Sequence, residues 1–228
     1  MPDRVSPEEL ELEFQRRQPW ITKYRIAGSA YGGDLDYAAD PRVADFLKHI
    51  PVRTRILELG SLEGGHSLAL ATDPSVKQVT ALEARPENIE KARFVQSLLE
   101  ITNVRFVQAD LREARLSDFA PVDAVLCSGV LYHLPEPWKL IEQIGEIAPA
   151  LFLWTHYARQ GTETINGYDF WPYHEPDLTK SLSGLQPTSL WFTLHSLVDC
   201  LMNHYTEVRI LKLDDIPAGL GVRLVALR

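Results

Sequence analysis

Segments with the pattern of buried strands alternate with segments of helical pattern through the middle of this 228-residue chain. Two of the helical runs begin with a proline near the first turn, where proline is favoured. Strands that alternate with helices pair in parallel through right-handed crossovers. We therefore expect parallel strands at 55–59, 77–83, 104–109, 122–127 and 150–155, and helices at 65–72, 86–100 and 136–148.

The C-terminal part of the chain departs from this alternation. Two strand-like runs, 205–211 and 221–227, are separated by a link too short for a crossover helix, so they should pair antiparallel. A dinucleotide-binding fold would continue with strand–helix units at this point. The predicted fold class is therefore α/β: a Rossmann-like, mostly parallel seven-stranded sheet with helices on both faces and a C-terminal antiparallel strand pair.

Residues 1–50 are expected to form an N-terminal arm that covers the ligand site of the sheet. A charged helix is predicted at 7–18, followed by an ordered loop at 20–33 that is rich in aromatic residues and glycine. Asp40 and Pro41 are a favourable N-cap and first residue for a further helix, which should end near residue 49.

Residues 51–228 should form the main domain, with one long insertion. The stretch at about 156–188 breaks the strand–helix alternation and contains many aromatic residues. Insertions of this length inside a compact domain usually serve function, so we expect a lid over the substrate. A helix is predicted after it, at about 189–204.

Charge and cysteine content narrow the class of protein further. The net charge of −8 and the isoelectric point near 5.4 argue against a nucleic-acid partner, because such proteins carry a basic surface. The two cysteines, Cys127 in a predicted core strand and Cys200, suit a reduced protein. No apolar run approaches the roughly 18 residues that a membrane helix needs. We expect a cytoplasmic protein without a membrane partner, and the sequence leaves its oligomeric state open.

The most informative motif for function lies where the first parallel strand ends. Residues 55–67 run from an apolar strand through Glu58 into a glycine-rich turn that contains Glu63. Glycines in such a turn let the backbone approach a nucleoside-like ligand closely. A pyrophosphate would be poorly accommodated, since Glu63 would place a negative charge beside it and the turn has no lysine. The motif favours a cationic adenosine cofactor, S-adenosylmethionine, over a nicotinamide dinucleotide.

Four segments, in the expected order, resemble the motifs of class I S-adenosylmethionine-dependent methyltransferases over roughly residues 50–228. The segments are 57–66, 79–86, 106–111 and 122–134, and Glu63 stands where the family often has a glycine. The Gly-Val-Leu-Tyr-His-Leu-Pro end of the fourth segment is a specific signal. The resemblance implies a methyltransferase that uses S-adenosylmethionine and modifies an oxygen or nitrogen atom of a small-molecule acceptor.

Acidic residues end three successive parallel strands, at the edge where open α/β sheets bind ligands. The carboxylate of Glu83 can accept both ribose hydroxyl protons. The resemblance implies that Asp110 accepts from the adenine amine, that the amide of Leu111 meets a ring nitrogen, and that the fourth strand borders the methionine part. The predicted cofactor-binding residues are Tyr31, Gly33, Glu58, Gly60, Ser61, Leu62, Glu63, Glu83, Ala84, Asp110, Leu111, Ser128 and Gly129.

Two histidines are candidates for a general base. A sulfonium methyl group is already activated, so the protein supplies alignment and a dry pocket, and a base takes the acceptor's proton where there is one. His133 is the first candidate and His156 the second, with a purely structural role open for either. The predicted acceptor-binding residues are Tyr132, Tyr168, Trp171, Tyr173, His174 and Trp191, and the nearby acids do not have the spacing of metal ligands.

Two other functions remain open at this point. Residues 189–193 and the Leu-Tyr-His-Leu-Pro stretch look somewhat like segments of the tRNA wobble-uridine carboxymethyltransferases, although the chain lacks the basic surface expected for tRNA. The chain could also be a non-catalytic module that binds S-adenosylmethionine and supports a partner.

Overall fold

The computed structural model describes residues 6–216 and 219–228, so the first residues of the arm and part of the turn before the last strand lie outside it. Among the described residues, seven strands form one sheet in the order β11-β12-β7-β6-β3-β4-β5. The parallel strands are β3 (Arg55–Leu59), β4 (Gln78–Glu83), β5 (Val104–Gln108), β6 (Ala124–Ser128) and β7 (Ala150–His156). β12 (Gly219–Leu227) pairs antiparallel with β7 and with β11 (Glu207–Ile216). The predicted fold class is confirmed.

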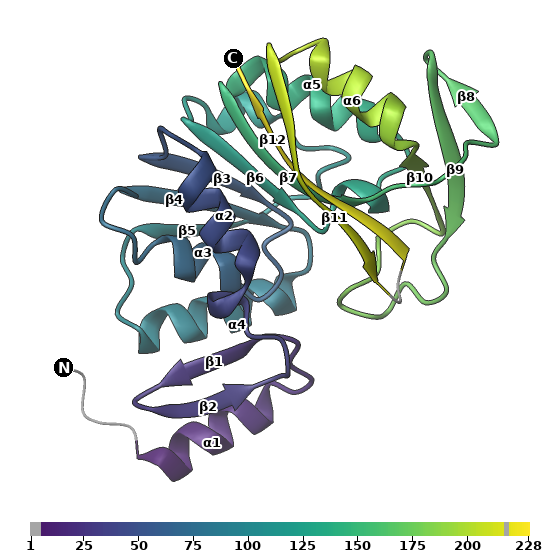
Figure 1. Cartoon of the computed structure of the whole chain (residues 1–228). Coiled ribbons are helices and arrows are strands. Elements are labelled where there is room, and N and C mark those ends of the chain that lie inside the picture. Colours follow the sequence, from purple (N-terminus) through teal and green to yellow (C-terminus); the bar gives the residue numbers. More distant parts are fainter. Residues whose placement is uncertain (1–5, 217–218) are drawn as a thin grey trace.

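Helices cover both faces of this sheet (Figure 1). On one face lie α2 (Pro41–His49), α3 (Gly65–Leu70) and α4 (Pro86–Leu98), and on the other α5 (Pro137–Ile147) and α6 (Leu194–Met202). Successive residues of the strands point to opposite faces of the sheet. Ile56 therefore packs in the hydrophobic core under α2, α3 and α4, and Leu57 packs in the core under α5 and α6. Because both faces are covered, the central strands are apolar nearly throughout.

The N-terminal arm contains a hairpin where a loop was expected. Helix α1 (Pro7–Arg16) is followed by β1 (Lys23–Ile26) and β2 (Ser29–Gly32), which pair antiparallel. The turn residues Ala27 and Gly28 both have positive φ, at 50° and 86°, as a two-residue hairpin turn requires. The expectation of a loop at 20–33 is therefore wrong. A short 3-10 helix, η1 (Tyr37–Ala39), connects the hairpin to α2.

The long insertion forms a small sheet of its own. The described strands of this sheet are β8 (Glu163–Ile165), β9 (Tyr168–His174) and β10 (Thr188–Phe192), in the antiparallel order β10-β9-β8. The helix expected at 189–204 is thus split into strand β10 and helix α6, with Thr193 between them as the N-cap. The Thr193 side chain accepts from the Ser196 amide, which fixes the start of the helix.

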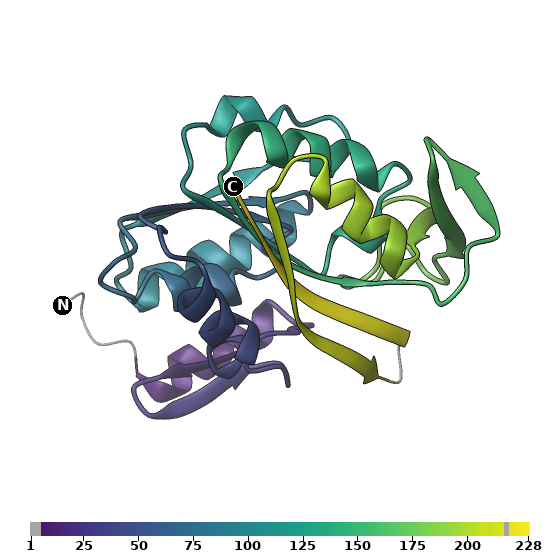
Figure 2. The same cartoon turned by 45° about the horizontal axis from the view of Figure 1, so that its top comes forward.

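The small sheet and the N-terminal hairpin lie at different ends of the molecule, as Figure 2 also shows. Two further 3-10 helices, η2 (Leu116–Phe119) and η3 (Leu131–His133), follow β5 and β6. Both cysteines are buried free thiols, and burial raises the pKa of Cys127 to about 12, so it cannot serve as a nucleophile at neutral pH. Within the described part of the chain, no helix has the length and apolar character that a membrane crossing requires.

Candidate functional site

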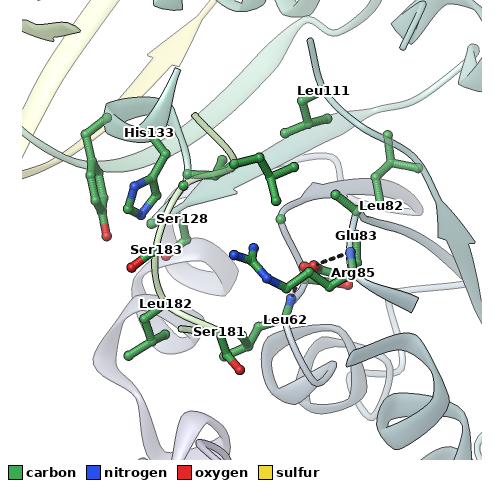
Figure 3. A pocket seen from close by; sticks show the side chains of 18 of the residues that line it. Leu62, Leu82, Glu83, Arg85, Leu111, Ser128, His133, Ser181, Leu182 and Ser183 are labelled. Carbon is green, nitrogen blue, oxygen red and sulfur yellow. Dashed lines mark hydrogen bonds between the residues drawn. The ribbon is translucent and has the colours of Figure 1, made fainter. Parts of the chain in front are cut away.

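A cavity of about 430 Å³ lies at the carboxyl ends of the parallel strands. Its floor is built by the ends of β3, β4 and β6 and the turns after them, and Ser181–Leu185 of the insertion close it from outside (Figure 3). We call residues 175–187 the covering segment. The predicted site residues that line the cavity are Gly60, Ser61, Leu62, Glu83, Ala84, Asp110, Leu111, Ser128, Gly129, Tyr132, His133 and His156.

The backbone of the turn after β3 forms part of the cavity floor. Gly60 has φ +71°, and a Cβ at this position would lie 2.9 Å from the Cβ of Val130. A glycine is therefore required both by the conformation and by the close approach of the turn after β6. The Oγ of Ser61 is buried and lines the same floor, and it has no hydrogen-bond partner among the residues that the structure describes.

Glu58 sits below this floor and does not line the cavity. It is 2% exposed and accepts a hydrogen bond from the Ser67 hydroxyl of α3. His66 connects it to the arm, with Nδ1 3.6 Å from Glu58 and Nε2 3.3 Å from Asp40. Burial opposes a charge on His66, but hydrogen bonds to Asp40 and Glu58 raise its pKa. Glu58 thus acts on the site through His66, which does line the cavity.

Glu63 also points away from the cavity, and this corrects the sequence-based argument about phosphate. Its carboxylate is fully buried, lies 2.9 Å from Lys91 Nζ and accepts from the amides of Ile21 and Thr22. The hydroxyl of Tyr24 donates to its carbonyl oxygen. The charge of Glu63 is therefore paired with Lys91 and used to hold the N-terminal arm. It gives no argument against a phosphate group in the cavity.

The side chain of Glu83, at the end of β4, is buried and accepts hydrogen bonds from neighbouring groups. Oε2 accepts from the Leu62 amide and Oε1 from the Arg85 amide, each at 2.9 Å (Figure 3). The Asn88 side chain donates to Oε1 at 3.3 Å. Burial raises the pKa of Glu83, although these hydrogen bonds oppose the shift. The donors fix the carboxylate at the cavity wall, where it can receive ligand hydroxyl groups.

Asp110 lines the cavity after β5, the strand that pairs with β4, and the Ala109 amide before it donates to the Glu83 carbonyl at 2.9 Å. Both of its oxygens accept from the Arg112 guanidinium, with distances of 2.9 and 3.0 Å from Nε. The Arg112 hydrogen bonds lower the pKa of Asp110, so it is ionised at neutral pH. It is thereby held as an acceptor whose remaining lone pairs can receive a further hydrogen bond.

His133 is paired with a carboxylate from the covering segment. Its Nδ1 hydrogen-bonds to Glu175, whose side chain is only 3% exposed. Burial lowers the pKa of His133, while the Glu175 hydrogen bond acts in the opposite direction. The sequence indicated His133 but not its contact with Glu175, because the two residues come from η3 and from the position after β9.

His156 lies deeper, among aromatic rings. Its Nδ1 donates to the Leu220 carbonyl at 3.1 Å, and burial lowers its pKa. Its ring stacks on Trp191 with 4.9 Å between centroids and an interplanar angle of 9°. Tyr132 meets the His156 ring edge-on at 4.5 Å. These rings form an aromatic wall beside the cavity, which Tyr132 and His156 line.

The other predicted acceptor residues are not in the cavity lining. Trp191 supports the wall from behind, and Tyr173 stacks on its outer side at 4.6 Å, with Trp171 beyond at the surface. Tyr168 accepts from the Asn203 side chain, and His174 pairs with Thr188. These residues lie on both faces of β9 and on β10, so the small sheet contributes none of the predicted residues to the lining.

Two predicted residues of the arm are also absent from the lining. Tyr31 stacks on Phe14 of α1, with 5.1 Å between the ring centroids. A Cβ on Gly33 would lie 2.4 Å from the Ile21 carbonyl oxygen, so this glycine allows two arm segments to pack closely. Both residues hold the hairpin together, and other arm residues (Leu35, Tyr37 and Arg42) reach the cavity instead.

Arg42 is the most important site residue that the sequence analysis missed. It comes from the first turn of α2, and its guanidinium is held by Asp40 and donates to the Ser128 hydroxyl at 3.1 Å. Its carbon Cζ lies 4.8 Å from the Trp154 ring centre. In the sequence, Arg42 is marked only by its position after the helix start at Asp40 and Pro41, and such a position is not specific for a ligand contact.

The residues present fit S-adenosylmethionine. Glu83 and Asp110 supply acceptors at the ends of the neighbouring strands β4 and β5. The buried Ser61 hydroxyl, which has no hydrogen-bond partner among the described residues, lies in the glycine turn after β3, on the other side of β4. Arg42 beside Ser128 provides a cation for a carboxylate. Among the described residues, no cluster of histidine, cysteine and acidic side chains could hold a metal ion.

Comparison with known proteins agrees with this geometry. A family model described as a methyltransferase domain matches residues 51–149. The N-terminal domain of EvdMO1, crystallised in the presence of SAH and D-fucose, is 32% identical with a TM-score of 0.86, covering 96% of each chain. The same domain with SAH bound is 31% identical with a TM-score of 0.87, covering 97% of each. SAH is the product that S-adenosylmethionine leaves after methyl transfer.

The comparison with full-length EvdMO1 is partial. That structure is 31% identical with a TM-score of 0.77, and the match covers 97% of this chain and 48% of EvdMO1. The chain therefore spans about half the length of the full EvdMO1 chain. No match is found among curated protein sequences.

Proposed function

The chain belongs to the class I S-adenosylmethionine-dependent methyltransferases, and we propose that it transfers the methyl group to an oxygen or nitrogen atom of a small-molecule acceptor. A sugar hydroxyl is the acceptor we favour. When bound, S-adenosylmethionine supplies an activated methyl group on a sulfonium centre. The enzyme must then align the acceptor, exclude water and receive the acceptor's proton.

The cofactor is assigned to the floor of the cavity. In this proposal Glu83 accepts the two ribose hydroxyl groups, Asp110 accepts from the adenine amine, and Arg42 binds the carboxylate of the methionine part. Three observations support it: the fixed carboxylate of Glu83, the ionised Asp110, and the guanidinium of Arg42 beside Ser128. Arg42 is preferred over Arg85 because it contacts Ser128 at the end of β6, the strand assigned to the methionine part, whereas Arg85 follows Glu83 on the ribose side.

We assign the general base to His133. A carboxylate can only accept, so the hydrogen bond to Glu175 leaves the proton of the neutral ring on Nδ1 and a lone pair on Nε2. That lone pair can take the proton of an acceptor hydroxyl. His156 has the same tautomer, since Nδ1 donates to Leu220, but it stacks on Trp191 and is assigned to the acceptor wall.

One observation carries the proposal: the strand-end acid Glu83 and the histidine His133 line the same cavity, beside the aromatic rings of Tyr132 and Trp154. An aromatic wall with few polar groups suits a compact organic acceptor, and the C–H face of a sugar ring packs well on such rings. The D-fucose present with the N-terminal domain of EvdMO1 points to the same class of acceptor.

The test is incubation of the protein with S-adenosylmethionine and a panel of deoxyhexoses, their glycosides and simple amines. Mass spectrometry should detect products heavier by one methylene group among the sugars. The His133→Ala variant should still bind SAH but form product ~10²–10⁴-fold more slowly, the range for loss of a general base. Binding of SAH without any methylated small molecule would contradict the proposal.

A further inference from the structure

The buried carboxylate of Glu175 has one titratable partner within hydrogen-bond distance among the described residues, the imidazole of His133. Its side chain is 3% exposed, and that of His133 is 14% exposed. A carboxylate withdrawn from water in this way is unfavourable unless it is hydrogen-bonded. The hydrogen bond to His133 therefore compensates for the burial of the Glu175 carboxylate.

The two partners are brought together by separate elements. His133 ends η3, and the following residue, Leu134, accepts from the Leu190 amide of β10 at 3.0 Å. Glu175 follows β9, and its own amide donates to the Pro187 carbonyl at 3.0 Å. The pairing of β9 with β10 thus sets the position of Glu175 relative to η3.

The covering segment packs directly on this pair. A Cβ at Gly184 would lie 3.0 Å from Oε1 of Glu175 and 3.1 Å from the Cβ of His133. A side chain at this position would press on both partners. The backbone of the covering segment therefore shields the hydrogen bond from water, which strengthens it electrostatically.

We infer that Glu175 is a positioning residue: it holds His133 in the Nδ1–H tautomer, with Nε2 turned to the acceptor, and stabilises the imidazolium formed during transfer. The inference rests on the proposed function. The acceptor oxygen bonds to the methyl carbon, the carbon–sulfur electron pair stays on sulfur, and the hydroxyl proton moves to Nε2 of His133. The positive charge is then shared with the carboxylate of Glu175, and the ring later loses the proton to water.

The hydrogen bond to Glu175 connects His133 to the covering segment. Glu175 begins this segment, and Gly184 of the same segment packs against both partners, so residues 175–187 supply the carboxylate and cover the pair. Arg85 donates to two carbonyls of the same segment, at 3.0 and 3.2 Å, and stands beside Glu83 in the sequence. The cofactor side and the acceptor side are thus connected through one covering segment.

The test compares Glu175→Gln and Glu175→Asp with Asp177→Asn as the matched control. Asp177 lies two residues further along, is partly exposed and accepts from the Thr179 amide rather than contacting His133. Glutamine keeps the size of Glu175 but removes its charge, and aspartate keeps the charge. We expect Glu175→Gln to lower kcat by at least tenfold, with KM and SAH affinity within about twofold, and Glu175→Asp to recover part of the loss. Asp177→Asn should behave as wild type.

A nitrogen NMR measurement of the His133 ring, in the SAH-bound protein, separates this inference from the proposed function. We expect the Nδ1–H tautomer in wild type, a mixture of tautomers in Glu175→Gln, and a lower His133 pKa in that variant, because the negative charge is lost while Arg85 and His156 remain. An unchanged tautomer and pKa would overturn the inference even in an active enzyme. The expected NMR result without any methyl transfer would support the positioning role and overturn the proposed function.

Discussion

The carboxylate of Glu63 is paired with the ammonium group of Lys91 in a buried contact, with 2.9 Å between Oε1 and Nζ. The same carboxylate accepts from two backbone amides of the N-terminal arm, and Lys91 also donates to the Pro19 carbonyl. The unusual glutamate of the glycine-rich turn therefore joins this turn to the arm. Its role is structural, and it holds the arm in place beside the cavity.

Removing Lys91 should destabilise the fold. In Lys91→Met the Glu63 carboxylate would remain buried without a cation, which typically costs about 3–5 kcal/mol. Urea unfolding measures this loss. The matched control is Lys139→Met, because Lys139 makes an exposed pair with Glu136 and should change stability by about 0.5 kcal/mol or less. Equal stabilities of the two variants would contradict the burial argument.

The Glu83 carboxylate should determine cofactor affinity. Loss of its charge in Glu83→Gln removes hydrogen bonds to a charged group, worth about 1.5–3 kcal/mol, and should raise the Kd for SAH about 10- to 100-fold. Calorimetry measures the change. Glu87→Gln is the control, since Glu87 is exposed on the first turn of α4 and should leave Kd unchanged. An unaltered Kd in Glu83→Gln would exclude the ribose assignment.

Arg42 should contribute to affinity only through the amino-acid part of the cofactor. The Arg42→Ala variant should bind SAH about tenfold or more weakly, because a charge-assisted pair is lost. Its affinity for methylthioadenosine, which has no carboxylate, should stay within about twofold of wild type. If both ligands bind equally more weakly, Arg42 supports the cavity wall and does not recognise the carboxylate.

The pH dependence of turnover should identify the base. His133 acts as a base only when neutral, and burial lowers its pKa below the ordinary value of about 6.5. We therefore expect full kcat at neutral pH and a decline only as the pH falls below that lowered pKa. The acidic limb should vanish in His133→Gln and persist in His156→Gln. A limb that follows His156 instead would reverse the two assignments.

Most of the main sheet could be predicted from the sequence, because its signals are local. Apolar runs mark β3 to β7, and Pro86 and Pro137 mark the first turns of α4 and α5. The short link after β11 was enough to predict the antiparallel end. For the same reason the strand-end acids were found, since each lies directly after an apolar run.

The parts that were missed depend on contacts between distant segments. The run Ser189-Leu190-Trp191-Phe192 has no periodicity that separates a strand from a helix, and its pairing with β9 decides the outcome. Lys91 and Glu63 come together only after α4 packs on the glycine turn. The contact of His133 with Glu175 likewise requires the small sheet to be in place.

Methyl transfer to a small molecule at this cavity can be tested with one labelling measurement. The protein is incubated with methyl-labelled S-adenosylmethionine and a cell extract, and the label is then separated into small-molecule, RNA and protein fractions. We predict label in the small-molecule fraction, with strong reduction in Glu83→Gln and His133→Ala. Label confined to RNA or protein, or no transfer by a protein that binds SAH normally, would contradict the account.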